Sequence, residues 1–135
     1  MPHPRPFWRV LLRCRAVTRA AKVPAAAGLS ATCPITEPEF FRSARSAEDR
    51  AQGIEGMRTI FSWVPVDDRA YTRAWQVQEA LTRRGRHRSA GAVDLVVAAT
   101  AELRGLTLLH RDRDFDCVAA VTGQVLQWYG PAPGK

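Results

Sequence analysis

Three aspartates occupy alternate positions in the stretch LLHRDRDFDC, residues 108–117. The apolar run LTLLH that overlaps its start is typical of a buried strand, so Asp112 and Asp114 follow the point where that strand ends. Carboxylate oxygens are preferred ligands of Mg²⁺, and ligand sites in parallel sheets lie at the carboxyl ends of strands. The stretch therefore fits two interpretations, a solvated turn with self-compensating charges or part of a metal site.

Further acids stand where other predicted elements begin. Asp94 precedes the apolar run LVVAATAEL, which predicts a buried helix. An N-cap role, favoured when Asp94 is considered alone, is compatible with a place in a metal site at the same sheet edge. Glu39 follows Thr36 at capping-box spacing, just after a predicted strand, and its neighbour Glu37 is expected to be exposed. Acids from separate parts of the chain are thus predicted to meet at one edge of a sheet.

Carboxylates that meet at one edge repel each other. Two of them about 4 Å apart repel by roughly 1 kcal/mol in water and by about 4 kcal/mol at an effective dielectric constant of about 20. Such a cluster favours a bound cation, and Mg²⁺ in a site of this kind supports phosphodiester cleavage without a protein nucleophile. The sequence contains no glycine-rich phosphate loop, HExxH motif or GxSxG motif, which would indicate other chemistries.

The chain is basic, and its basic residues are nearly all arginine. Lysine and arginine number 20 against 13 acids, which gives a net charge of +7. This composition suits a polyanion such as RNA, although GC-rich coding produces the same excess of arginine. Arg86 and Arg88 lie in the loop RGRHRSAG before the Asp94 helix, and Arg111 lies beside the aspartates. These three arginines are candidate contacts to nucleic-acid phosphates, with a solvated loop as the alternative.

Length and composition predict one globular domain. It is expected to cover residues 7–129, with an irregular N-terminus at 1–6 and a disordered tail at 130–135. No run of about 18 apolar residues is present to span a membrane, and arginines interrupt the apolar core that a signal peptide needs. The three cysteines have neither zinc-site spacing nor the even number of a disulfide framework. These features predict a cytoplasmic protein without a membrane partner.

Short apolar strands alternate with helices along the chain, which predicts an α/β fold around a mostly parallel sheet. Helices are expected at 7–21, after Thr36, from Ser46 to Ile60, at 67–85, at 95–103 and at 115–123, and strands at 29–35, 63–66, 106–110 and 125–128. One stripe of the 67–85 helix, together with a residue of the last strand, is expected in the core: Tyr71, Ala74, Trp75, Leu81 and Trp128.

Two stretches resemble the PIN-domain ribonucleases, especially the VapC-type toxins of bacterial toxin–antitoxin pairs. They are CPITEPEFFRSARS and GRHRSAGAVDLVVAATAELRGLTLLHRDRDFDCVAAVTGQ, within a resemblance that covers about residues 32–129. The resemblance implies a Rossmann-like α/β/α sandwich, a site of acids for Mg²⁺ or Mn²⁺, and cleavage of RNA, often tRNA or ribosomal RNA. It also implies a cognate antitoxin that inhibits the protein, and a homodimer.

The resemblance assigns roles to four acids. Glu39, which is followed by FFRSAR, matches the glutamate in the middle of the family's pattern, and Asp94 matches the aspartate that opens the alanine-rich helix. Asp112 matches the last acidic position, with Asp114 close enough to assist. All four are expected to be catalytic, and the three aspartates are expected to bind the metal. Asp116 is expected to cap a helix.

The chain departs from the family at its start. The family begins with a hydrophobic strand that ends in a metal-binding aspartate, whereas here MPHPRP, with His3, stands in that place before the predicted 7–21 helix. The first strand is therefore expected to be missing or degenerate. Two hypotheses follow: an endoribonuclease toxin in which a metal-activated water cleaves RNA, or a catalytically inactive, N-terminally truncated PIN domain that only binds RNA or an antitoxin.

Overall fold

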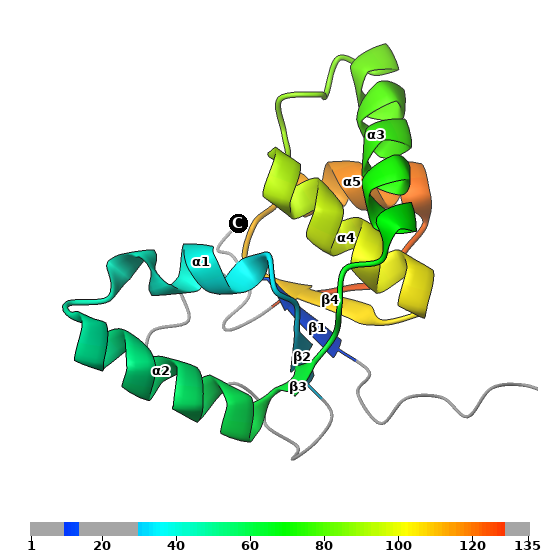
Figure 1. Cartoon of the computed structure of the whole chain (residues 1–135). Helices are drawn as coiled ribbons and strands as arrows, with labels where there is room; N and C mark the ends of the chain where they lie inside the picture. The colour runs from blue at the N-terminus through cyan, green and yellow to red at the C-terminus, as the bar shows by residue number, and fades with distance from the viewer. Residues whose placement is uncertain (1–9, 14–29, 129–135) are drawn as a thin grey trace, which may run out of the picture.

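The computed structural model describes residues 10–13 and 30–128 (Figure 1). The described elements are β1 (Val10–Arg13), β2 (Ser30–Thr32), α1 (Thr36–Phe40), η1 (Phe41–Ser43), α2 (Ala47–Ile60), β3 (Ser62–Trp63), α3 (Asp68–Arg83), α4 (Ala92–Arg104), β4 (Thr107–His110), α5 (Asp114–Thr122) and β5 (Leu126–Trp128). Helices alternate with short strands, which confirms the predicted α/β fold.

The five strands form one sheet in the order β3-β2-β1-β4-β5, and the four neighbouring pairs are all parallel. β1 is the central strand, and it pairs with β4 along its full length, from Val10 opposite Thr107 to Arg13 opposite His110. Because parallel strands point the same way, the segments that follow the five strands leave from one edge of the sheet.

The presence of β1 corrects the prediction for the start of the chain. A helix was expected over 7–21 and the first strand was expected to be missing or degenerate, but residues 10–13 form a strand at the centre of the sheet. An apolar run of this length has no periodicity that separates a strand from a helix, so pairing with β2 and β4 decides its structure. The predictions for 1–6, for His3, for the rest of 7–21 and for the 130–135 tail lie outside the described residues.

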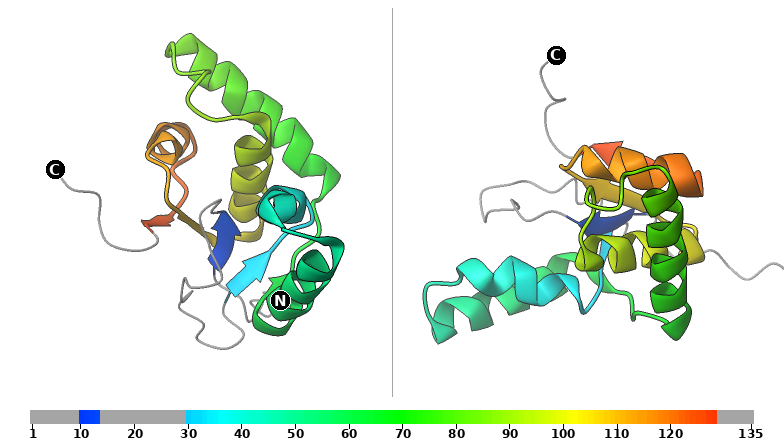
Figure 2. Two further views of the ribbon diagram at one scale, coloured as in Figure 1. Left: turned by 90° about the vertical axis from the view of Figure 1, so that its left-hand side faces the viewer. Right: turned by 90° about the horizontal axis from the view of Figure 1, so that it is seen from above.

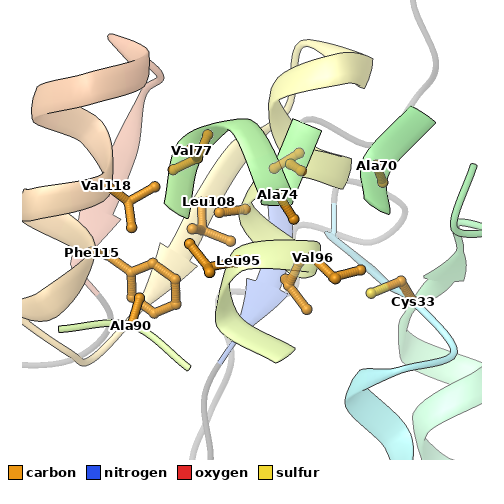
Figure 3. Close-up of a cluster of buried hydrophobic side chains, with 14 of the residues drawn as sticks. Cys33, Ala70, Ala74, Val77, Ala90, Leu95, Val96, Leu108, Phe115 and Val118 are labelled. Atoms are coloured by element: carbon orange, nitrogen blue, oxygen red, sulfur yellow. The ribbon is translucent and has the colours of Figure 1, made fainter. Parts of the chain in front are cut away.

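Three helices pack together over the sheet, and α1 and α2 extend to one side of them (Figures 1 and 2). α4 is buried nearly all round, as predicted, from Leu95 to Ala101. Leu108 of β4, Val77 of α3 and Phe115 of α5 meet it in one cluster of apolar side chains (Figure 3). Within the described residues no helix is long and apolar enough to cross a membrane.

The face that α3 turns to the core differs from the prediction. Ala74 and Leu81 are buried as expected, but Tyr71 and Trp75 are 54% and 66% exposed. The buried stripe is Ala70, Ala74, Val77 and Leu81. Small alanines on this stripe permit a close approach of α4, and the Arg73 guanidinium of α3 donates to both carboxylate oxygens of Glu102 on α4.

α2 begins where the sequence predicted, because the Ser46 side chain accepts a hydrogen bond of 3.0 Å from the Asp49 N–H. Its two glycines have different surroundings. A Cβ at Gly53 would lie 2.5 Å from the ring of Phe41, whereas a Cβ at Gly56 would meet no atom within 4 Å. Gly53 therefore permits the close approach of the buried Phe41 ring. No side chain packs closely against Gly56 in this way.

We expect Gly56→Ala to raise the free energy of unfolding by up to about 1 kcal/mol, because alanine is the better helix former. Gly53→Ala should instead lower it by about 1 kcal/mol or more, because the Phe41 ring must move. Urea denaturation followed by circular dichroism measures both values. Equal stabilisation by the two substitutions would show that Phe41 does not pack on Gly53.

Candidate functional site

Asp112, in the loop between β4 and α5, and Asp114, the first residue of α5, lie at the edge where β4 ends. The Asp112 N–H donates to Nδ1 of His110 over 3.1 Å, and the Asp112 carboxylate accepts from the Asp114 N–H over 2.9 Å. The Phe115 N–H donates to the Asp112 carbonyl over 3.1 Å. These bonds turn the chain tightly from the strand into α5, and they leave both carboxylates exposed to solvent.

Asp94 lies in the first turn of α4. The N-cap of this helix is Gly91, so Asp94 is not itself the N-cap. Its carboxylate accepts a hydrogen bond of 3.3 Å from the Gly91 N–H, which satisfies one of the unpaired donors at the helix start. The prediction that the Asp94 carboxylate accepts a hydrogen bond at the helix start is thus confirmed. The prediction that Asp94 occupies the N-cap position is wrong. Asp94 is half-buried, and Figure 1 shows the first turn of α4 next to the loop that leads into α5.

The three aspartates interact electrostatically. The pKa of Asp114 is raised above its ordinary value of 3.8, first because neighbouring protein atoms remove part of its hydration even though the residue is exposed. The negative charge of Asp112, a hydrogen bond to Asp112 and the charge of Asp94 raise it further. Asp94 of α4 therefore lies near enough to Asp114, at the start of α5, for its charge to act on that carboxyl group.

Of the two glutamates in α1, the structure describes the side chain of Glu37 but not that of Glu39. Glu39 belongs to α1, but its side chain is outside the described part of the chain. Glu37 was expected to be exposed, and this was wrong: it is 7% exposed, with one carboxylate oxygen 4.0 Å from the Arg58 guanidinium and the other without a hydrogen-bond partner. The spacing of residues in α1 carries no signal for this burial, and the ion-pair partner of Glu37 lies on α2, further along the chain.

The three arginines proposed as RNA contacts are all exposed. Arg86 and Arg88 lie in the loop that leads into α4, and Arg111 lies immediately before Asp112. Arg111 therefore adjoins Asp112 in the chain, and Arg86 and Arg88 precede the helix that carries Asp94. Exposed guanidinium groups beside a carboxylate cluster are suited to phosphate groups that approach the same edge.

The carboxylate oxygens of Asp94, Asp112 and Asp114 are ligands that suit Mg²⁺ or Mn²⁺, but they are few. In the described ranges, 10–13 and 30–128, no three His, Cys, Asp or Glu side chains are placed closely enough to hold a metal ion. The sequence also contains no acid before Glu37, so β1 brings no carboxylate to the edge. Mg²⁺ is commonly held by one or two carboxylates and several waters, and the repulsion among Asp94, Asp112 and Asp114 would be relieved by a cation.

Comparison with known proteins gives one consistent result. The sequence pattern of the PIN domain matches residues 12–121. Ribonuclease VapC21 of Mycobacterium tuberculosis is 45% identical over 107 residues, which cover 79% of this chain and 77% of that protein. Ribonuclease VapC51 of the same organism is 39% identical over 117 residues, covering 87% of this chain and 84% of that protein.

Two solved structures share the fold. The first is a DNA-bound VapBC from Salmonella typhimurium, with a TM-score of 0.74 and 20% identity over 91% of this chain and 99% of that one. The second is VapBC-5 of Mycobacterium tuberculosis, described as a member of the VapBC family of toxin-antitoxin systems. It has a TM-score of 0.61 and 24% identity over 91% of this chain and 99% of that one. At these identities the likeness establishes the fold.

The repulsion among the aspartates leads to a prediction about pH. In the protein without metal, Asp112→Asn should lower the pKa of Asp114 more than Asp94→Asn does, because Asp112 contributes more to the upward shift. Since a cation binds the deprotonated form, metal affinity should fall as the pH falls through the raised pKa of Asp114. The pH dependence of the Asp114 carboxyl ¹³C shift, recorded by NMR with EDTA, measures this pKa. An unchanged pKa in both variants would show that the three carboxylates do not share a site.

Proposed function

This chain belongs to the PIN-domain family, within its VapC group, and from this membership we propose that it is a metal-dependent endoribonuclease, the toxin of a toxin–antitoxin pair. One observation carries the proposal: Asp94, Asp112 and Asp114 interact at the carboxyl edge of the sheet, in a chain similar over most of its length to proteins named ribonucleases. Such an edge is where parallel α/β sheets place their ligands.

The proposed roles of the acids follow from their positions. Asp94, Asp112 and Asp114 would hold Mg²⁺ or Mn²⁺, with Glu39 as a further candidate from α1. A divalent ion at such a site supplies stabilisation for the negative charge on the attacking and leaving oxygens of a phosphodiester. The backbone bonds of Asp94 and Asp112 orient these carboxylates before any ion is bound.

The proposed RNA contacts are Arg86, Arg88 and Arg111. Their exposed guanidinium groups would hold the RNA backbone while a scissile phosphate lies over the carboxylates. Contacts of this kind give affinity without sequence selection, so we infer the class of substrate, tRNA or ribosomal RNA, from the family. A cytoplasmic location agrees with such a substrate and with a free thiol at Cys117.

The proposed partner is a cognate antitoxin. The two solved neighbours are VapBC proteins, one of them described as part of a toxin-antitoxin system. By analogy the present chain would bind an inhibitory antitoxin chain, and it would also form a homodimer. Both assemblies are proposals about this chain that stand beside the ribonuclease activity.

A second function is favoured by one specific feature. β1 occupies the centre of the sheet, yet no acid precedes Glu37 in the sequence, so the central strand supplies no carboxylate to the site. The alternative is a PIN domain that binds RNA or an antitoxin without cleaving RNA. Its binding surfaces would be the same exposed arginines, and its carboxylates would not complete a catalytic metal site.

One experiment, RNA cleavage with and without a divalent metal, distinguishes the two functions. The purified 135-residue chain should cleave RNA when Mn²⁺ or Mg²⁺ is added, and EDTA should abolish the cleavage. We expect Asp94→Asn to reduce the rate by about 100-fold or more, because even residues that only orient a metal ligand contribute 10–100-fold. Cleavage of a fluorescently labelled RNA measures the rate.

Asp68→Asn provides the matched control. Asp68 also lies in the first turn of a helix and is exposed, but it belongs to α3. Its substitution should leave the rate unchanged. If the folded wild-type chain binds RNA and does not cleave it at any metal concentration, the binding function replaces the enzymatic one.

A further inference from the structure

His110 is a polar residue in an apolar position. It is the last residue of β4, opposite Arg13 of β1 and Trp128 of β5, and it is 2% exposed. Its ring packs against two aromatic rings, with centroid distances of 5.1 Å to Phe115 and 5.5 Å to Trp128. Burial of an imidazole carries a desolvation cost that a leucine or phenylalanine at the same position would not carry.

Nδ1 of His110 makes one hydrogen bond that an apolar side chain could not make. Nδ1 accepts the N–H of Asp112 over 3.1 Å, so it carries a lone pair and the ring proton lies on Nε2. The bond joins the core to the loop that bears the site, because Asp112 in turn accepts the N–H of Asp114 over 2.9 Å. A continuous chain of hydrogen bonds therefore runs from a ring fixed in the core to two of the three aspartates.

We propose that His110 is a positioning residue for the metal-binding carboxylates. The packed ring holds Nδ1 in place, Nδ1 fixes the backbone of Asp112, and the Asp112 carboxylate fixes the start of α5 at Asp114. This inference rests on the proposed function, because it assumes that Asp112 and Asp114 bind a divalent cation. Residues that orient a metal ligand in this way contribute 10–100-fold to affinity or activity in other proteins.

Two substitutions separate positioning from packing. His110→Phe keeps an aromatic ring against Phe115 and Trp128 but has no acceptor for the Asp112 N–H. His110→Asn loses the ring but places its side-chain oxygen near the position of Nδ1. The phenylalanine variant should therefore be the more stable of the two, and the asparagine variant should bind metal more tightly. A purely structural role would give the same order in both measurements.

The measurements are thermal unfolding and Mn²⁺ binding to the full chain, followed by electron paramagnetic resonance. We expect His110→Phe to retain the fold and to weaken Mn²⁺ binding by about 10–100-fold. His110→Asn should unfold at a lower temperature and should bind Mn²⁺ nearly as tightly as the wild type. Loss of Mn²⁺ affinity in proportion to the loss of stability in both variants would overturn the proposal.

Amide hydrogen exchange tests the positioning without any metal. In wild type the Asp112 and Asp114 amides should be protected, and His110→Phe should accelerate their exchange while His110→Asn restores protection. If the wild-type chain binds no Mn²⁺, the proposed function fails, and the exchange rates still decide whether His110 holds the loop. Unchanged exchange in His110→Phe would overturn the positioning role whether or not the metal binds.

Discussion

The parallel pairing of every described strand is the constraint on which the rest of the structure depends. It directs all strand ends to one edge, where the charge of Asp94 in α4 acts on Asp114 at the start of α5. β4 lies between β1 and β5, so its last residue, His110, is held on both sides. The aspartates that follow are thereby attached to one of the most enclosed parts of the fold, although they are partly or fully exposed to solvent.

The carboxylates of the site are held in place by the fold itself. Asp94 accepts the Gly91 N–H at the start of α4, and Asp112 accepts the Asp114 N–H at the start of α5. Each bond satisfies a donor that a helix start would otherwise leave unpaired, which offsets part of the repulsion between the charges. Structural capping and metal binding are therefore compatible uses of the same side chains, and neither role excludes the other.

The sequence predicted features that depend on local chemistry. The Ser46 cap, the all-round burial of α4 and the strand before the aspartates follow from residue type and periodicity. The predictions that were wrong concern features that depend on contacts between distant segments. The predicted stripe of α3 included Trp75, whereas the face that packs against α4 buries small alanine side chains and leaves Trp75 exposed. Pairing with β4 likewise made a strand of residues 10–13, and the ion-pair partner of the buried Glu37 is Arg58 of α2.

The turn after β4 determines which of its residues can be substituted without a change in its geometry. Its geometry is maintained by main-chain donors and by acceptors at positions 110 and 112. The exposed side chain of Arg111 stands between them and makes none of these bonds. Exchange of this residue would alter the charge presented to a polyanion while the neighbouring carboxylates kept their orientation. The charge of this surface can therefore change at position 111 while the turn that holds Asp112 and Asp114 keeps its geometry.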